Sequence, residues 1–323
     1  MPQATGSPRA RRLDEQGFVV AEGILDAGAD LQPILDEYAA VLDRVVESLH
    51  ERREIERTYA DLPFGQRLIQ VTREAGRSLS QHFDMSLPQT GIRSETPIHL
   101  GPACFRLLTN QRLLDLAEEL IGPEILVSPV GHVRIKLPEG TLPGGGDGLM
   151  AKIPWHQDNG VVLEEADRSN ILTVWLPISE ATVENGCMQV VPTDRTAELM
   201  THCPSKGKGA HVPDRYVDEA RSVVLPMKPG SVLLMHARTL HSSLENVTRD
   251  QVRISMDLRY QPVGEATGRP MFPEFVGRSR SHPERELRDP DAWAEMWLAA
   301  RRRLAEDQPA AFNRWDPSSS VCA

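Results

Sequence analysis

Hydrophobic residues recur at steps of three and four between Asp26 and about Arg57, and this spacing predicts a long amphipathic helix. Its apolar positions are Leu31, Ile34, Leu35, Tyr38, Val41, Leu42, Val45, Val46 and Leu49. A second helix is predicted from about Asn110 to Ile121, because Gly122 and Pro123 follow it as helix-stopping residues commonly do. A third is predicted from Asp291 to Glu306, where one apolar stripe contains Trp293, Met296, Trp297, Ala300 and Leu304. We interpret that stripe as a packing surface.

After Glu124 the pattern changes to short runs rich in β-branched residues, with glycine and proline between them. Such runs predict β-strands, here Ile125 to Ser128, His132 to Leu137, Ile171 to Ile178, Met188 to Val191, Val223 to Leu225, Ser231 to His236 and Val252 to Tyr260. Short strands with turns of this kind favour a jelly-roll sandwich or barrel. We therefore expect a mainly β fold with flanking helices.

The chain of 323 residues is expected to form a single domain with three parts. These are a helical N-terminal part at about 13–122, a barrel core at about 124–262 and a C-terminal helical extension at about 285–323. Residues 1–12 are small, polar and basic, and we expect them to be mobile.

Two loops between the predicted strands are candidates for a role near a site. Residues 137–149 contain PEGTLPGGGDGL, which lacks the Lys-Ser/Thr ending of a phosphate-binding loop. We expect this segment to be either a flexible lid or an ordinary solvent loop. Residues 193–218 form a longer polar stretch, and long loops in compact domains are commonly functional or disordered. This stretch is a candidate cover for the mouth of the barrel.

The composition excludes several classes of partner. With 36 Lys and Arg against 46 Asp and Glu, the net charge of −10 gives no basic footprint for nucleic acid. No apolar run reaches about 18 residues, so a membrane span is not expected. Asp14 and Glu15 precede any apolar stretch that a signal peptide would need, which favours a cytoplasmic location.

The cysteines carry a separate expectation about compartment and metal binding. Cys104, Cys187, Cys203 and Cys322 include no C-x-x-C pair. We therefore expect neither a disulfide framework nor a cysteine zinc site. The prediction is mostly buried thiols, with one cysteine in the tail.

The densest group of polar residues is the run Trp155-His156-Gln157-Asp158-Asn159. Residues two apart in an extended segment share a face, so His156 and Asp158 can point at one ion. Some 80 residues later a predicted strand ends at His236, and His241 follows. Two imidazoles and one carboxylate form the donor set of non-heme Fe(II) oxygenases, which leaves positions open for a 2-oxo acid and O2.

A zinc hydrolase uses the same types of donor, so it remains an alternative at this point. Such an enzyme needs a general base beside its metal-bound water. Glu164 and Glu165 are the acids nearest in sequence to the first two donors.

A strand beginning at Arg253 alternates polar and apolar residues. Its polar face contains Arg253, Ser255, Asp257 and Arg259, which suggests a wet or ligand-filled barrel interior. An arginine there can bind a carboxylate through two parallel hydrogen bonds. The alternative is that Asp257 pairs with Arg253 or Arg259 in a purely structural network.

Three separated motifs resemble the phytanoyl-CoA dioxygenase family of Fe(II)/2-oxoglutarate oxygenases. They are WHQD, TVWLPISEATVENGCMQVVPTD and GSVLLMHARTLHSSLENVTRDQVRISMDLRY. The resemblance extends over roughly Ile125 to Tyr260 and implies a double-stranded β-helix, a jelly-roll barrel with iron at its mouth. It also implies Fe(II) as the metal, 2-oxoglutarate as the co-substrate and O2 as the oxidant.

Compared residue by residue, the resemblance implies that His156, Asp158 and His241 are the iron ligands. It selects His241 over His236 because the family's distal histidine precedes a small residue and a serine or glycine, with an arginine about a dozen residues later. His241 is followed by two serines, and Arg253 stands twelve residues after it. His236 is then expected to be a neighbouring structural histidine.

The same resemblance implies a pocket for 2-oxoglutarate. Arg253 would bind its distal carboxylate, and Ser243 would donate a hydroxyl to that carboxylate. Trp175 matches a position that walls the pocket, and Val133 matches one that is often apolar against the co-substrate. Candidates for polar contacts with the substrate are Arg134 and Lys136.

The reaction implied is hydroxylation, or another oxidation, of an unactivated C–H bond, with release of succinate and CO2. Related enzymes that halogenate replace the acidic ligand with a small residue, and here Asp158 is present. We expect a small-molecule substrate, no nucleic-acid or membrane partner, and a monomer or homodimer. The remaining alternative is a non-oxidative protein that kept the scaffold, either a cupin-like metal-binding isomerase or a small-molecule binding protein.

Overall fold

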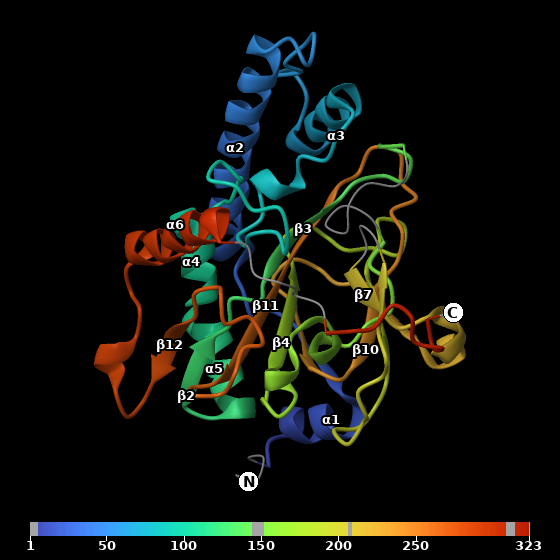
Figure 1. Ribbon diagram of the computed structural model, residues 1–323, viewed down its shortest axis with the longest axis vertical. Helices are drawn as coiled ribbons and strands as arrows, with labels where there is room; N and C mark the ends of the chain where they lie inside the picture. Colours follow the sequence, from blue (N-terminus) through green and yellow to red (C-terminus); the bar gives the residue numbers. More distant parts are fainter. Residues whose placement is uncertain (1–5, 144–151, 206–208, 308–313, 323) are drawn as a thin grey trace.

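Two antiparallel β-sheets form the centre of the protein (Figure 1). The computed structural model describes residues 6–143, 152–205, 209–307 and 314–322. The larger sheet has seven strands in the order β1-β9-β4-β11-β2-β12, and β3 pairs with the first half of the long strand β11. Its strands are β1 (Phe18–Ala21), β2 (Glu124–Val127), β3 (His132–Lys136), β4 (Leu172–Pro177), β9 (Val232–His236), β11 (Arg253–Pro262) and β12 (Phe275–Ser279).

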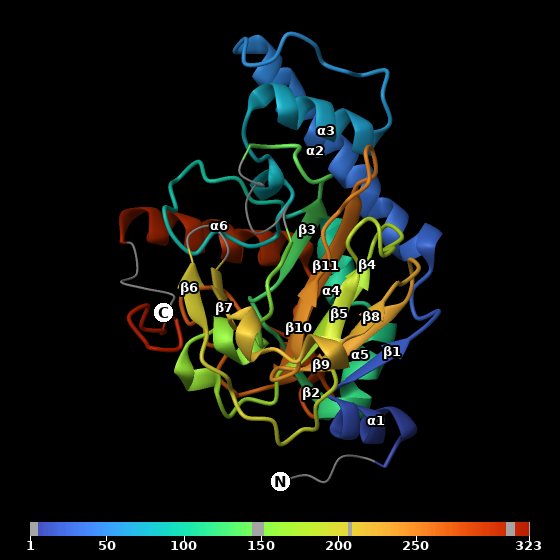
Figure 2. The ribbon, with the colours of Figure 1, turned by 90° about the vertical axis from the view of Figure 1, so that its right-hand side faces the viewer.

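The smaller sheet lies against one face of the larger one (Figure 2). It has the order β10-β5-β8 and is made of β5 (Met188–Val191), β8 (Val223–Leu225) and β10 (Leu240–Ser243). A separate hairpin pairs β6 (Cys203–Ser205) with β7 (Gly209–His211). Two packed antiparallel sheets confirm the predicted mainly β, jelly-roll fold.

Strand β11 separates two interiors with different chemistry. Ile254, Met256, Leu258 and Tyr260 belong to the large apolar core between the sheet and the helices. The alternate positions, Arg253, Ser255, Asp257 and Arg259, are also buried, but they face the smaller sheet. Because side chains alternate along a strand, the polar set predicted from the sequence lies on the inner face of the barrel.

Six α-helices surround the sheets among the described residues: α1 (Pro8–Gln16), α2 (Gln32–Glu51), α3 (Phe64–Ala75), α4 (Pro102–Leu108), α5 (Gln111–Ile121) and α6 (Pro290–Glu306). Helices α4, α5 and α6 cover the outer face of the larger sheet, while α2 and α3 extend beyond one end of it (Figure 1). The helices predicted from apolar periodicity are α2, α5 and α6. None of the described helices is long and apolar enough to cross a membrane.

The expectation of a mobile terminus up to residue 12 is wrong for residues 8–12, which belong to α1. The side chain of Ser7 accepts a hydrogen bond from the backbone of Ala10, and Pro8 occupies the first turn. Gly17 ends the helix in the left-handed conformation, with φ of 77°. Capping and contact with the barrel stabilise α1, and the apolar periodicity of so short a segment did not reveal it.

Every predicted strand is present, and the structure adds β1, β6, β7, β10 and β12. These extra strands have three to five residues, and β6, β7 and β10 contain no β-branched residue, which is the signal that identified equally short strands such as β5 and β8. The long loop 193–218 contains the β6–β7 hairpin, with 206–208 outside the described residues. Of the other candidate loop, residues 144–149 lie outside the described ones, so its role as a lid stays a prediction.

The expectation for the cysteines requires a correction. Cys203 and Cys322, which are 119 residues apart, form a disulfide bond. Cys104 and Cys187 are free and buried, as expected. The pairing escaped prediction because it depends on where the tail returns to the barrel, which cysteine spacing does not reveal.

Candidate active site

His156 and His241 face each other across an antiparallel backbone bridge, in which His156 pairs with strand β10 of the smaller sheet. Each backbone N–H donates to the carbonyl of the other residue, at 3.0 Å in both directions. Directly opposed residues in such a bridge project their side chains to the same side. The two ring centroids are consequently only 4.2 Å apart.

Backbone carbonyls fix the orientation of both rings. Nδ1 of His156 lies 2.9 Å from the carbonyl of Pro154, and Nδ1 of His241 lies 2.8 Å from that of Thr239. A carbonyl can only accept, so each Nδ1 carries the proton and each Nε2 presents its lone pair. This is the usual arrangement of metal-binding histidines, whose second nitrogen is held by a neighbouring acceptor.

Asp158 completes the group of donors. Its Oδ1 lies 4.0 Å from Nε2 of His156, and one donor atom from each of Asp158 and the two histidines fits within a mutual distance of 4.8 Å. Thr173 on β4 and Arg259 on β11 donate hydrogen bonds to the two carboxylate oxygens. The larger sheet therefore holds the carboxylate while the smaller sheet holds the imidazoles.

The electrostatics leave Asp158 and His156 in the states that a divalent metal requires. Burial raises the pKa of Asp158, but Arg259 and the two histidines outweigh burial and hold that pKa below the usual range. Burial, and then the proximity of His241, lowers the pKa of His156 well below its ordinary value. An ionised carboxylate and neutral imidazoles are the forms that bind metal ions, so the residues present fit Fe(II).

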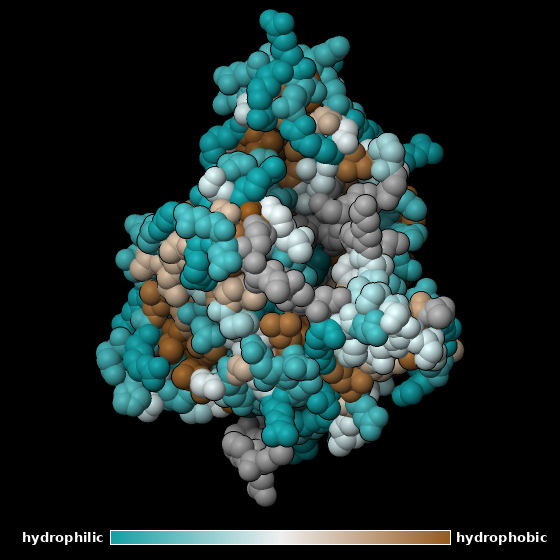
Figure 3. Space-filling view, viewed as in Figure 1, coloured by the Kyte–Doolittle hydropathy of each residue, from teal (hydrophilic) through white to brown (hydrophobic). Residues whose placement is uncertain are grey.

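A pocket with about 350 Å³ of empty space, partly open to solvent, extends from these donors between the sheets. It is lined by Arg134, Ile153, His156, Thr173, Trp175, Met188, Met235, His241, Ser243, Arg253, Asp257 and Arg259. The space-filling view shows a hollow near the middle of the face above β3 and β4 (Figure 3). The sequence-predicted residues Trp175, Ser243 and Arg253 all line the pocket.

Arg253 supplies a buried positive charge with no acidic partner among the described residues. Its side chain donates to Ser255 and to the carbonyl of Gly186, while its Nε has no hydrogen-bond partner. Burial, followed by repulsion from Arg134, lowers the pKa of Arg253 to about 9. The guanidinium carbon lies 5.6 Å from the centre of the Trp175 ring. An anion entering this pocket would satisfy both the charge and the unused donor.

The structural network considered for β11 does exist, but it excludes Arg253. Asp257 accepts from Nε of Arg134 at 2.6 Å and from Nη1 of Arg259 at 3.3 Å. Arg259 in turn pairs with Asp158, so charges alternate along this row towards the metal donors. Because Asp257 is occupied by two other arginines, Arg253 stays available for a ligand.

Ser243 is prepared to donate a hydrogen bond. Its oxygen accepts from Nζ of Lys136 at 2.7 Å and from the backbone N–H of Ile153 at 3.1 Å. With both lone pairs used, the hydroxyl proton can be directed to a ligand. Lys136 itself is buried and bonded to Ser243 and to the carbonyl of Leu244, so it supports the pocket wall instead of contacting substrate.

Val133 does not belong to the pocket, which corrects its predicted place beside the co-substrate. The register of β3 on β11 pairs Val133 with Met256 and Arg134 with Ser255. Val133 therefore lies in the apolar core on the outer face of the sheet, and Arg134 has the inward position. A shift of one residue along a strand exchanges the two faces, and the sequence alone did not determine that register.

The other polar candidates lie outside the group of donors. His236 is near Asp14, with 3.6 Å between Nε2 and the carboxylate, and it does not line the pocket. Glu164 and Glu165 are exposed on a turn and also do not line it. The site therefore has no glutamate placed as the base of a zinc hydrolase among the described pocket residues.

Sequence reasoning missed the supporting roles of Arg259 and Thr173. Both hold Asp158, yet they come from strands 101 and 15 residues away in the chain. The polar face of β11 was a signal for Arg259. No pattern in the sequence distinguished Thr173 from an ordinary strand residue.

A second group of possible metal donors, Glu37, His99 and Cys104, lies among the helices. Glu37 already accepts from the backbone of Ala103 at 2.8 Å and contacts Nε2 of His99 at 3.1 Å. Burial raises the pKa of Cys104 to about 12, so its thiol stays protonated. This group is explained by helix packing and hydrogen bonding.

The jelly-roll fold and a donor set of two histidines and one aspartate define a class, the non-heme metalloproteins with open coordination positions. The profile of one family, described as phytanoyl-CoA dioxygenase (PhyH), matches residues 13–255. The chain belongs to this family of non-heme iron and 2-oxoglutarate oxygenases.

Individual relatives are distant. Phytanoyl-CoA dioxygenase domain-containing protein 1 of Bos taurus is 21% identical over 257 residues, which are 74% of this chain and 84% of that protein. The 1-deoxypentalenic acid 11-beta-hydroxylase of Streptomyces arenae is 29% identical over 124 residues, 36% of this chain and 43% of the hydroxylase. These matches are similarities and do not transfer a substrate.

Solved structures show the same fold. The non-heme monooxygenase ThoJ aligns with a TM-score of 0.59 and 19% identity, over 92% of this chain and 97% of ThoJ. EvdO2 from Micromonospora carbonacea var. aurantiaca, complexed with 2-oxoglutarate, aligns with a TM-score of 0.51 and 22% identity, over 81% of this chain and 94% of EvdO2.

Proposed function

We propose that this protein is an Fe(II)- and 2-oxoglutarate-dependent dioxygenase. It hydroxylates, or otherwise oxidises, an unactivated C–H bond of a small-molecule metabolite and releases succinate and CO2. The observation that supports this most is the convergence of His156, Asp158 and His241 beside a buried arginine, Arg253, that has no acidic partner in the described part of the chain. A metal donor set and an anion site in one pocket match a metal-chelating dicarboxylate.

In this proposal His156 and His241 hold iron through Nε2, and Asp158 holds it through a carboxylate oxygen. When bound, iron and 2-oxoglutarate supply the activation of O2 that side chains cannot perform. The protein contributes position and protonation state. Backbone carbonyls fix both imidazoles, and Arg259 and Thr173 keep the carboxylate ionised and oriented.

Arg253 and Ser243 would bind the distal carboxylate of 2-oxoglutarate, beside the ring of Trp175. Two donors of a guanidinium match the two oxygens of a carboxylate, and burial strengthens the attraction because water does not screen it. Arg134, which is half-buried at the pocket, is a candidate for a polar contact with the substrate.

The test is turnover of 2-oxoglutarate by purified protein supplied with Fe(II). We expect succinate to form only when both Fe(II) and O2 are present, and Asp158→Ala to abolish its formation. A panel of candidate metabolites then identifies substrates as compounds that accelerate succinate release. Succinate formation without oxygen, or at a full rate in Asp158→Ala, would overturn the proposal. A protein that binds metal but never converts 2-oxoglutarate would favour the non-oxidative alternative.

A further inference from the structure

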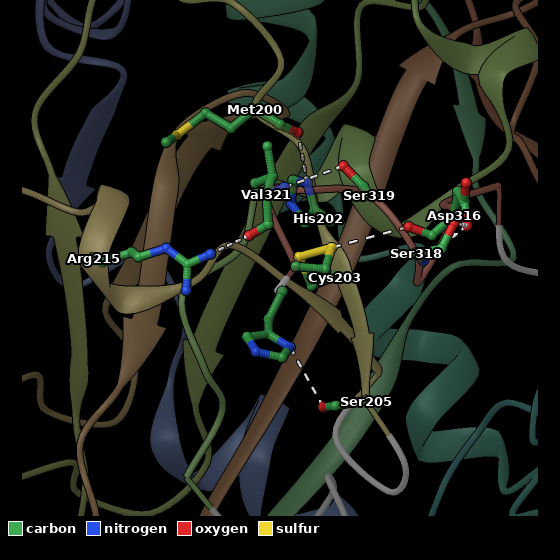
Figure 4. Close-up of a disulfide and its surroundings, with 11 residues drawn as sticks. Met200, His202, Cys203, Ser205, Arg215, Asp316, Ser318, Ser319 and Val321 are labelled. Carbon is green, nitrogen blue, oxygen red and sulfur yellow. Dashed lines mark hydrogen bonds between the residues drawn. A yellow bond between two sulfur atoms is a disulfide. The ribbon is translucent and has the colours of Figure 1, made fainter.

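The C-terminal segment, residues 314–322, returns to the side of the barrel that carries the β6–β7 hairpin (Figure 1). The disulfide joins Cys322 in this segment to Cys203 at the start of β6 (Figure 4). Arg215 adds a hydrogen bond of 2.8 Å to the carbonyl of Val321. The end of the chain is thus fastened close to residues that precede β6.

Trp315 makes the contact that matters for the site. Its ring stacks on the imidazole of His202, with 5.3 Å between ring centroids and 24° between their planes. Its indole N–H donates to the carbonyl of Gly160, which lies just beyond the metal donors. Beside it, Arg314 forms an ion pair of 2.6 Å with Asp167.

His202, which Trp315 contacts, is also hydrogen-bonded to the segment that carries two of the proposed metal ligands. Nδ1 of His202 donates to the carbonyl of Met200 at 2.8 Å, so its Nε2 is an acceptor. That Nε2 accepts the backbone N–H of Gln157 at 2.9 Å, and Gln157 lies between His156 and Asp158. The imidazole therefore bonds directly to the backbone that separates two proposed iron ligands.

The surroundings leave this segment little freedom once His202 is in place. The side chain of Gln157 bonds to the backbone of Met200 at 2.7 Å, of Glu198 at 3.0 Å and of Arg238 at 2.8 Å. A Cβ at Gly160 would lie 2.0 Å from the His202 ring, so the ring fills the space above the turn. Movement of His202 would disturb this packing directly.

From this series of contacts we infer that the C-terminal segment supports the metal site and that the Cys203–Cys322 disulfide controls this support. With the disulfide formed, Trp315 holds His202, and His202 holds the backbone between His156 and Asp158. With the disulfide reduced, no covalent bond ties the segment to β6, and among the described residues it is held by the Trp315 stacking, the hydrogen bonds of Trp315 and Arg215, and the Arg314–Asp167 ion pair. The site then binds metal more weakly. Trp315 and His202 are positioning residues, and the inference rests on the iron site proposed above.

The redox step is ordinary thiol–disulfide exchange with a dithiol reductant. One thiolate of the reductant attacks a sulfur of the protein disulfide, and the S–S bond breaks as a mixed disulfide forms. The second thiolate displaces the remaining protein thiolate, which takes up a proton. Two electrons and two protons pass to Cys203 and Cys322, and the reductant is left as an internal disulfide.

The experiment measures the Fe(II) affinity of the full-length, metal-free protein under anaerobic conditions, by competition with a chromophoric chelator. One sample is oxidised, and the other has been reduced with a dithiol that is removed before Fe(II) is added. We expect reduction to weaken Fe(II) binding by about tenfold or more, as changes in groups that orient metal ligands commonly do. Equal affinities in the two samples would overturn the inference.

Variants separate positioning from general damage. Cys322→Ser is expected to match the reduced protein and to lose its response to the dithiol. Ser318→Ala is the matched control and should leave affinity unchanged, because the Ser318 hydroxyl donates to Asp316 within the segment itself. Thermal unfolding of each variant shows whether the barrel itself is intact.

Substitutions of the two positioning residues provide a readout that a purely structural role would not give. His202→Gln keeps one donor and one acceptor and is expected to retain most of the Fe(II) affinity, whereas His202→Leu loses it. Trp315→Phe keeps the stacked ring and should exceed Trp315→Ala in affinity. Equal losses within either pair, with intact folding, would contradict the assigned roles.

The outcomes also distinguish this inference from the proposed function. If the oxidised protein binds no Fe(II), the iron site fails and the inference fails with it. If the oxidised and reduced proteins bind Fe(II) equally well, the iron site stands and only the role of the C-terminal segment is rejected.

Discussion

The guanidinium of Arg253 is fully buried, lies beside the ring of Trp175, and has Ser255 and the Gly186 carbonyl, but no carboxylate, as partners among the described residues. A buried charge without a partner is costly unless a ligand compensates for it. Its lowered pKa, about 9, reflects that cost. The residue therefore makes sense as half of an ion pair whose other half is a bound anion.

Replacing Arg253 by Gln tests this directly. We expect the 2-oxoglutarate concentration at half-saturation to rise by about 10- to 100-fold, since a hydrogen bond to a charged group contributes about 1.5–3 kcal/mol. Fe(II) affinity should be unchanged because Arg253 does not contact the metal donors. A titration of succinate formation against 2-oxoglutarate measures the effect, and an unaltered half-saturation point would remove Arg253 from the co-substrate site.

Lys136 provides a prediction about stability and pH. Burial, together with Arg253 and Arg134, lowers its pKa from 10.5 to about 5. Between these two values the unfolded chain binds one proton more than the folded chain, so this lysine lowers stability increasingly as the pH falls. The dependence is at most about 1.4 kcal/mol per pH unit.

Lys136→Met removes that dependence. The variant should therefore gain stability relative to the wild type as the pH falls. Its unfolding free energy minus that of the wild type, measured by urea denaturation, should be larger at pH 6 than at pH 9. Lys228→Met, at an exposed position, is the matched control and should show no such trend. A difference between Lys136→Met and wild type that is constant over this range would show that Lys136 is charged in the folded protein.

At the scale of single residues, the sequence was sufficient to propose site residues that belong to a short motif. His156 and Asp158 lie two apart, and His241 was recognisable from the serines and the arginine that follow it. Val133 was assigned to the wrong face of the sheet, because the face that a side chain occupies depends on the register between strands. Arg259 and Thr173 were missed for the same reason, since their contact with Asp158 exists only in the folded sheet.

Among the structural elements, the turn before β5 links the two sheets through Gly186. This glycine has φ of 90°, and a Cβ there would lie 2.6 Å from both the carbonyl oxygen of Leu244 and Cδ of Lys136. Its own carbonyl accepts a hydrogen bond from Arg253. The turn consequently helps to position the proposed anion site.

Gly186→Ala should lower the unfolding free energy by about 2–5 kcal/mol, combining a left-handed backbone penalty with overpacking. The matched control is Gly264→Ala, with φ of 92° and no atom within 4 Å of the added Cβ. It carries only the backbone penalty. Urea denaturation measures both variants, and we expect only Gly186→Ala to weaken 2-oxoglutarate binding. Equal effects of the two substitutions would exclude a special role for this turn.

Elements with a clear apolar pattern or stop signal were predictable, whereas α3 (Phe64–Ala75), although it has 12 residues, and several short elements were not. Helices α2, α5 and α6 have a clear apolar stripe, whereas α4 has only seven residues and β10 has two serines among its four. These short elements are stabilised by contacts with distant parts of the chain. Strand β10, for example, is stabilised by its pairing with β5. This pairing positions His241.

At the scale of the whole molecule, the Cys203–Cys322 disulfide closes a loop that contains β7 to β12 and α6. Such a cross-link restricts the unfolded chain, and removing one commonly costs about 2–5 kcal/mol. We expect reduction to lower the unfolding free energy by this amount, measured by urea denaturation with and without a dithiol. Cys322→Ser should show the same loss and no response to the dithiol. Unchanged stability on reduction would mean that the bond is absent from the protein in solution.

The same disulfide bears on the cellular location. Structural disulfides are rare in reducing compartments, so this bond argues against the expected cytoplasmic location unless the bond has a redox role. The location and the choice between monomer and homodimer stay predictions. The net charge of −10 continues to argue against a nucleic-acid partner.

In the proposed function, three side chains from two distant segments, His156, Asp158 and His241, bind one ferrous ion. Anaerobic equilibrium dialysis of metal-free protein against Fe(II), followed by elemental analysis, measures this directly. The account predicts about one iron per chain in the wild type, as expected for a single set of three protein ligands. The same value is expected in His236→Ala, because this histidine ends β9 and lies outside the pocket. No iron above background is expected in Asp158→Ala or His241→Ala. Full iron binding in Asp158→Ala would contradict the account.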